Sequence, residues 1–157
     1  MRKRLITPTR ENIRARGEGW LDIERAAVVE LTSEDPDYPI ESAFISGEAR
    51  GWRAAGVGIQ TIRLIFDHPQ NLRRISLVFE EREMARTQEF ILRWSAGEEG
   101  LMKEIVRQQW NFSPPETISE VEEYRAEISS VTVLELVINP NIGGEGARAS
   151  LKHFRIS

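Results

Sequence analysis

The stretch TIRLIFDHPQNLRRISLVFE, residues 61–80, contains two apolar runs on either side of a turn signal. Apolar residues recur at every second position of TIRLIFD and again of RISLVFE, which is typical of strands with one buried face. The segment between them, Asp-His-Pro-Gln-Asn, is rich in turn-forming residues. The stretch therefore predicts two antiparallel strands joined by a short turn at residues 67–71.

The same pattern recurs along the rest of the chain. Further strand-like runs are LDIERAAVVELT (a long or bulged first strand), EFILRWS, VRQQWNF, YRAEI, VTVLELVI and LKHFRI. About eight short strands separated by turns predict an all-β protein, an antiparallel β-sandwich of the jelly-roll type. One segment competes, because Ser119 and Glu122 have the spacing of a helix capping box, so a short helix near residues 118–124 stays open.

Composition restricts the class of protein. The 157 residues suit a single domain, predicted over residues 19–157, and a net charge of −4 argues against a surface built for nucleic acid. The absence of cysteine excludes disulfides. A basic arm, residues 1–18, is either a solvated tail or a contact for nucleic acid or an acidic partner. Because no long apolar run follows its basic start, we expect a cytoplasmic protein.

Counting hairpins places the longest loops together. Antiparallel strands joined by turns run alternately up and down, so alternate loops gather at one end of a sandwich. This count groups the loops 45–60, 80–86, 113–119 and 139–148. Loops held by a rigid scaffold often carry binding residues, so this end is the predicted binding end.

The predicted binding end is rich in arginine. A guanidinium fork suits carboxylates and paired hydroxyls, and an indole face stacks on the C–H surface of a sugar. The candidate ligand-binding residues are Arg50, Trp52, Arg53, Arg82, Arg86, Asn141 and Arg148. In the alternative interpretation the arginines pair with neighbouring glutamates and Trp52 plugs the core. We favour the core position for Trp52 and leave both roles open for Arg53 and Arg86.

Four segments resemble a known family. ESAFISGEARGWRA, IRLIFDHPQNLRRISLVFEE, TQEFILRWSAG and ASLKHFRI, within residues 20–157, resemble the discoidin module of coagulation-factor C domains. This resemblance implies a galactose-binding-like jelly roll that holds saccharides, phospholipids or proteins at one end. The family often has an Asp-Gly pair before the tryptophan that helps to hold calcium. Ser46-Gly47 stands there in this chain, and a hydroxyl is a poor calcium ligand, so we predict no metal.

Signals for catalysis are weak. The two histidines, His68 and His153, have no metal-ligand spacing around them, and no Gly-x-Ser-x-Gly elbow is present. We therefore predict a non-enzymatic module, without a cofactor, that binds a saccharide or another small polar ligand. A protein partner is the alternative, and nucleic acid bound through the basic arm is a third. Met84 and Ile142 supply little apolar surface for a membrane, so no membrane contact is predicted.

Overall fold

The computed structural model describes residues 19–45, 47, 50–97 and 101–157. The basic arm 1–18 and Ser46 lie outside the described residues. Within them the helices and strands are α2 (Ile23–Ala26), β1 (Ala27–Leu31), α3 (Glu41–Phe44), β2 (Trp52–Arg53), β3 (Gln60–Glu80), β4 (Arg86–Ser95), β5 (Lys103–Phe112), β6 (Ser119–Asn139), β7 (Ser150–Leu151) and β8 (His153–Ile156). No helix in this described part is long and apolar enough to cross a membrane.

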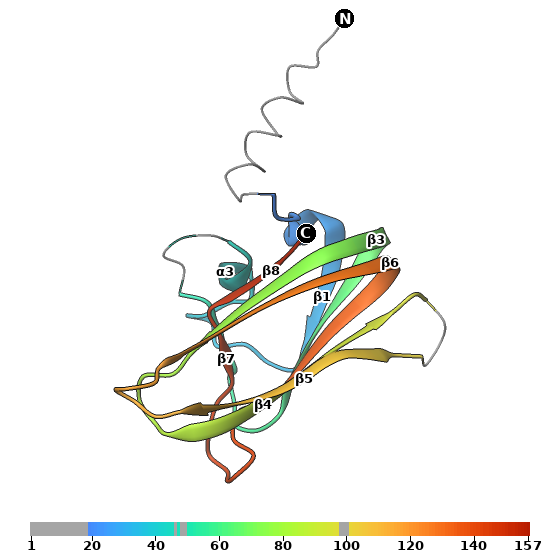
Figure 1. The fold of residues 1–157 in the computed structure, drawn as a ribbon. Helices are drawn as coiled ribbons and strands as arrows, with labels where there is room; N and C mark the ends of the chain where they lie inside the picture. The colour runs from blue at the N-terminus through green and yellow to red at the C-terminus, as the bar shows by residue number, and fades with distance from the viewer. Residues whose placement is uncertain (1–18, 46, 48–49, 98–100) are drawn as a thin grey trace, which may run out of the picture.

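The two longest strands, β3 and β6, form one ribbon that bends back on itself (Figure 1). Their ladder pairs Gln60 with Ile138 before the bend and Glu80 with Ser119 after it. Between these halves the register shifts, and the exposed segment 67–69 interrupts the alternating burial of β3. The turn predicted at residues 67–71 is therefore the bend of a continuous ladder.

The bend separates two antiparallel layers. One layer contains β1, the first half of β3, the second half of β6, β4 and β5, and the other contains the remaining halves of β6 and β3 followed by β8. A small ladder of β2 and β7 lies at the side. This arrangement confirms the predicted antiparallel sandwich.

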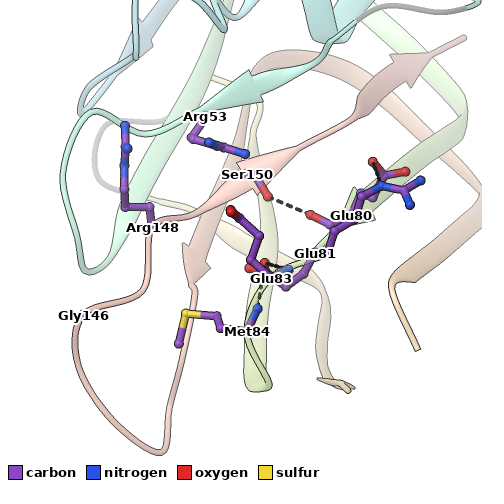
Figure 2. Close-up of a pocket in the computed structure, with 9 residues that line it drawn as sticks. Arg53, Glu80, Glu81, Glu83, Met84, Gly146, Arg148 and Ser150 are labelled. Carbon is purple, nitrogen blue, oxygen red and sulfur yellow. Dashed lines mark hydrogen bonds and ion pairs between the residues drawn. The ribbon is translucent and has the colours of Figure 1, made fainter. Parts of the chain in front are cut away.

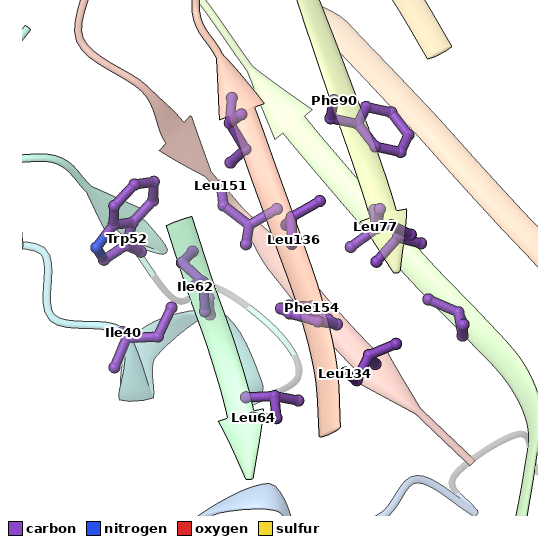
Figure 3. Packing of buried hydrophobic residues seen from close by; sticks show 14 of the residues in the cluster. Ile40, Trp52, Ile62, Leu64, Leu77, Phe90, Leu134, Leu136, Leu151 and Phe154 are labelled. Carbon is purple, nitrogen blue, oxygen red and sulfur yellow. The ribbon is translucent and has the colours of Figure 1, made fainter. Parts of the chain in front are cut away.

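The hydrophobic core lies between the layers. The rings of Phe79 and Phe90, one from each layer, lie 5.1 Å apart between centroids. Figure 3 shows Trp52, Leu151 and Phe154 beside the apolar faces of β3 and β6. Burial of apolar surface on this scale is the main term that favours folding.

Two local predictions were wrong. The helix considered near residues 118–124 is the start of β6, where Glu120, Glu122 and Tyr124 turn inward and Val121 is 61% exposed. Pairing with β3 satisfies the backbone of this segment and overrides its helical spacing. The predicted long first strand instead begins with the helical turn α2, in which Asp22 O accepts from the Ala26 amide at 3.1 Å, and β1 follows.

Backbone hydrogen bonds join the four predicted loops at one end. Gly58 N donates to Ala147 O at 3.1 Å, and Ile142 N donates to Thr87 O at 2.8 Å, beside the 80–86 loop. Glu81 N donates to Ile118 O at 2.8 Å. These loops lie at the end of the sandwich away from the bend of β3 and β6 (Figure 1). The loop grouping predicted from hairpin counting is therefore confirmed for the described residues.

Candidate functional site

Two adjoining depressions at the loop end have volumes of about 430 Å³ and 280 Å³. Both are lined by Arg53, Glu80, Arg82 and Ser150, so they form one continuous surface feature, which we call the arginine groove. The larger part is completed by Glu81, Glu83, Met84, Gly146 and Arg148, and the smaller part by Tyr38, Arg50, Trp52, Leu151 and Lys152. Taken together, these volumes are in the range of small-molecule sites.

The groove has two walls of different charge. Arg53 and Ser150 face each other in the β2–β7 ladder and form one wall with Arg148 (Figure 2). The acidic segment 80–83, at and beyond the end of β3, forms the other wall. Ser150 Oγ donates to Glu80 O at 3.0 Å and joins the two walls at the base.

Arg53 is supported by an aromatic ring. Its guanidinium carbon lies 4.5 Å from the centroid of Tyr38, and that of Arg50 lies 5.5 Å from the same ring. The Tyr38 backbone is fixed, because its N–H donates to Asp35 O at 2.8 Å and its carbonyl accepts from Arg53 N at 3.2 Å. No carboxylate of the described residues lies within ion-pair distance of Arg53. Stacking on a ring leaves the N–H edge of a guanidinium available to a ligand.

The other two groove arginines have internal partners. Arg148 donates to Asp35 Oδ2 at 3.1 Å and, through Nε, to Ala54 O at 2.9 Å. The Asp37 amide and the Arg148 guanidinium hold the pKa of Asp35 below its usual value, against a smaller effect of burial. Arg82 pairs with Glu80 at 3.2 Å on an exposed surface. Both arginines contact protein groups and still line the groove.

Gly51 permits the β2–β7 ladder that carries Arg53. Its φ of +80° lies in the left-handed region. A Cβ at this position would lie 2.6 Å from the carbonyl oxygen of Leu151 and 2.8 Å from Lys152 Cα. Only glycine allows both this backbone conformation and this approach. The Arg-Gly-Trp-Arg sequence thus has a steric reason for its glycine.

Trp52 and Arg86 are structural. Trp52 is 1% exposed, and its indole Nε1 donates to Ser33 O at 3.1 Å, so the core position favoured from sequence is confirmed (Figure 3). The buried Arg86 side chain donates to Glu81 Oε1 at 2.6 Å and to Pro140 O at 2.8 Å. Neither side chain is available to a ligand in this arrangement.

Asn141 also serves the loops. Its Oδ1 accepts from the amides of Thr87 at 3.3 Å and Gly143 at 3.2 Å. Four of the seven predicted site residues are therefore arginines whose charged side chains line the groove. These are Arg50, Arg53, Arg82 and Arg148.

Sequence reasoning missed Tyr38, Ser150 and Lys152 as groove residues. Tyr38 follows the turn signal Asp-Pro-Asp at residues 35–37, which was not connected with the arginine-rich loop. Lys152 follows the inward-facing Leu151, so strand alternation could have placed it outward. The proximity of Tyr38 to Arg53 depends on tertiary packing, and no local pattern contains it.

The acidic wall of the groove contains one carboxyl group with a shifted pKa, that of Glu81. Over the described ranges, no group of three or more His, Asp or Glu side chains is placed to hold a metal ion. Burial would raise the pKa of Glu81, but the Arg86 guanidinium and the amides of Glu83 and Met84 outweigh it and hold that pKa below its usual value. A carboxyl group held ionised in this way does not suit a general acid.

Comparison with solved structures identifies the fold. The family 32 carbohydrate-binding module of NanJ from C. perfringens, solved in complex with galactose, matches with a TM-score of 0.59 at 12% identity over 87% of this chain and 96% of that one. A family 32 module from a family 31 glycoside hydrolase of Clostridium perfringens matches with a TM-score of 0.62 at 19% identity, over 90% and 96%. This chain has the galactose-binding-like jelly-roll fold of those modules.

The same jelly roll also occurs inside a larger enzyme. A Ruminococcus gnavus family 29 fucosidase, solved in complex with fucose, matches with a TM-score of 0.63 at 10% identity over 84% of this chain but only 25% of that one. No protein-family model and no curated protein matches the sequence. At these identities the likeness defines the jelly-roll fold, and the function has to be argued from the groove.

Proposed function

We propose that this protein is a non-catalytic carbohydrate-binding module whose saccharide lies in the arginine groove. The proposal rests on one observation, the opposition of guanidinium donors and carboxylate acceptors across a groove at the loop end. Arg53 and Arg148 line one wall, and Glu83 lies on the other (Figure 2). A sugar hydroxyl donates and accepts hydrogen bonds, so a row of hydroxyls can use both walls at once.

The jelly-roll relatives support this proposal at the level of fold. The NanJ module was solved with galactose, and a family 32 module of AlyQ was solved with 4,5-unsaturated mannuronic acid. The AlyQ module matches with a TM-score of 0.55 at 14% identity over 88% of this chain and 97% of that one. Saccharide binding is thus compatible with the scaffold, and the groove residues of this chain supply the specific argument.

A non-catalytic role is consistent with the position of Glu120, the carboxyl group whose pKa is raised furthest. Burial raises the pKa of Glu120 to about 9, with a further contribution from Glu122. Glu120 is 1% exposed and lies between the sheets, where Gln88 Nε2 donates to its Oε1 at 3.1 Å. A general acid must reach the bond that it protonates. Glu120 does not line the groove, so its protonated state serves the fold.

A panel of immobilised glycans tests the proposal. The native protein is compared with Arg53→Gln, which removes the stacked cation, and with Arg73→Gln, which removes an exposed cation near the bend at the far end. We expect the native protein and Arg73→Gln to bind the same glycans. Loss of a charge-assisted hydrogen bond should weaken Arg53→Gln about tenfold to a hundredfold.

Circular dichroism and thermal unfolding establish that each variant is folded. A native protein that binds no glycan would contradict the proposed function. Equal binding by Arg53→Gln and the native protein would place the saccharide elsewhere and contradict the assignment to the groove.

A further inference from the structure

We propose that the saccharide is acidic, and that its carboxylate binds between Arg50, Arg53 and Lys152 in the smaller part of the arginine groove. This inference rests on the proposed function and specifies its ligand class. It concerns the end of the groove beside Tyr38, away from the acidic wall at Glu81 and Glu83.

The two parts of the groove differ in charge. The larger part is lined by three arginines and three glutamates, so positive and negative groups balance. The smaller part is lined by three arginines and one lysine but by a single glutamate, Glu80. That glutamate already pairs with Arg82 at 3.2 Å. The smaller part is therefore cationic, although the whole chain has a net charge of −4.

The three remaining cations make no ion pair with a carboxylate of the described residues, and Asp35 acts on Arg53 only at longer range. Arg50 makes a long hydrogen bond of 3.5 Å to Asp37 O and stacks on Tyr38. Arg53 stacks on the same Tyr38 ring, with its guanidinium carbon 4.5 Å from the ring centroid. Lys152 is half-buried at the β7–β8 junction. Placing like charges close together costs free energy, and an anionic ligand would relieve that cost.

A uronic acid fits the change in charge along the groove. Its planar carboxylate matches the guanidinium fork of Arg53 at the cationic end. Its hydroxyls, and those of the next sugar, can reach the mixed donors and acceptors at Arg148 and Glu83. A neutral sugar would leave the cations in the smaller part of the arginine groove without an anionic ligand.

Matched ligands test the carboxylate directly. Trisaccharides of galacturonate, glucuronate and mannuronate are each compared with their methyl esters, which keep the ring and the hydroxyls but lose the charge. We expect at least one acid to bind about tenfold or more tightly than its ester, as one charge-assisted contact provides. Lys152→Gln and Arg50→Gln, measured separately, should reduce that preference severalfold by weakening binding of the acid more than binding of the ester, whereas Arg73→Gln should alter neither.

The outcomes separate this inference from the proposed function. Equal affinity for acid and ester would overturn the inference while saccharide binding stands, and failure to bind any saccharide would overturn both. A single-stranded oligonucleotide or a sulfated galactoside serves as a further probe. Binding of either one as tightly as the best uronate would show a general anion surface and overturn the assignment to a carboxylate.

Discussion

Arg53 and Arg86 lie at the same end of the sandwich, but their surroundings differ in almost every respect. The Arg86 side chain is fully buried, 2.6 Å from the Glu81 carboxylate, with its guanidinium 4.7 Å from the Phe112 ring centroid. Arg53 lines an open groove, stacks on Tyr38 and makes no ion pair with a carboxylate of the described residues. The comparison shows that position at the loop end does not decide the role of an arginine. Burial and the presence of an anionic partner decide it.

Replacement of Arg86 by alanine should give the largest effect on stability. Removing one partner of a buried ion pair leaves Glu81 without its cation, which costs about 3–5 kcal/mol in the free energy of unfolding. Urea denaturation followed by circular dichroism measures this loss. Arg53→Ala is the matched control and should lose less than about 0.5 kcal/mol. Equal losses in the two variants would remove the distinction between the two regions.

Gly51→Ala should be the next most damaging change. The added Cβ meets the backbone of Leu151 and Lys152 and places alanine at a φ of +80°, which costs about 1–3 kcal/mol. Because the β2–β7 ladder carries Arg53, saccharide affinity should fall together with stability. Gly56 is the control, since a Cβ there meets no atom within 4 Å. Gly56→Ala with a loss as large as that of Gly51→Ala would contradict the steric explanation.

The buried Glu120 should make the stability of the protein depend on pH. Its folded pKa is raised to about 9 by burial, so the folded protein keeps a proton that the unfolded chain releases above about pH 4.5. The contribution of Glu120 to stability should therefore be greatest at low pH, and it should fall as the pH rises towards 9. Glu120→Gln mimics the protonated form and should flatten that decline.

Unfolding by urea at pH 5 and pH 9 measures the effect of Glu120→Gln. We expect near-native stability at pH 5 and a gain over the native protein at pH 9. Glu127→Gln, an exposed change on the same strand, controls for the loss of one negative charge. An identical change of stability with pH in the native protein and Glu120→Gln would contradict a protonated Glu120.

Arg82→Gln should have only a small effect on stability. The Arg82 side chain, which pairs with Glu80, is 65% exposed, and exposed ion pairs contribute about 0–1 kcal/mol to the free energy of unfolding. Because Arg82 already has this partner, we expect a smaller loss of saccharide affinity than for Arg53→Gln. Titration calorimetry of both variants with one glycan makes the comparison. A larger loss for Arg82→Gln would place the principal cation on the opposite wall.

Much of the fold could be predicted because alternation is local. The period of two in residues 61–80 places Ile62 and Leu77 in the core, and both are buried. The start of β6 was ambiguous, since the capping-box spacing of Ser119 and Glu122 favours a helix until β3 supplies its backbone partners. Local spacing cannot represent a partner that is about 40 residues away in sequence.

The site could be predicted only in part. The hairpin count grouped the correct loops, and five of the seven chosen residues line the groove, although Trp52 among them is buried. The hairpin count could not distinguish the role of Arg53 from that of Arg86, because the burial of Arg86 depends on Phe112 and Pro140, which lie elsewhere in the chain. It also missed Tyr38, whose ring supports Arg53 from a segment 15 residues earlier in the chain.

The most direct test of the central claim is to map amide chemical-shift changes while a bound glycan is titrated into ¹⁵N-labelled native protein. The account predicts that the amides of Arg53, Ser150 and Lys152 shift with the ligand, while those at the bend, residues 67–71, stay in place. Shifts confined to the bend or to the outer face of the β1–β5 layer would contradict saccharide binding in the arginine groove.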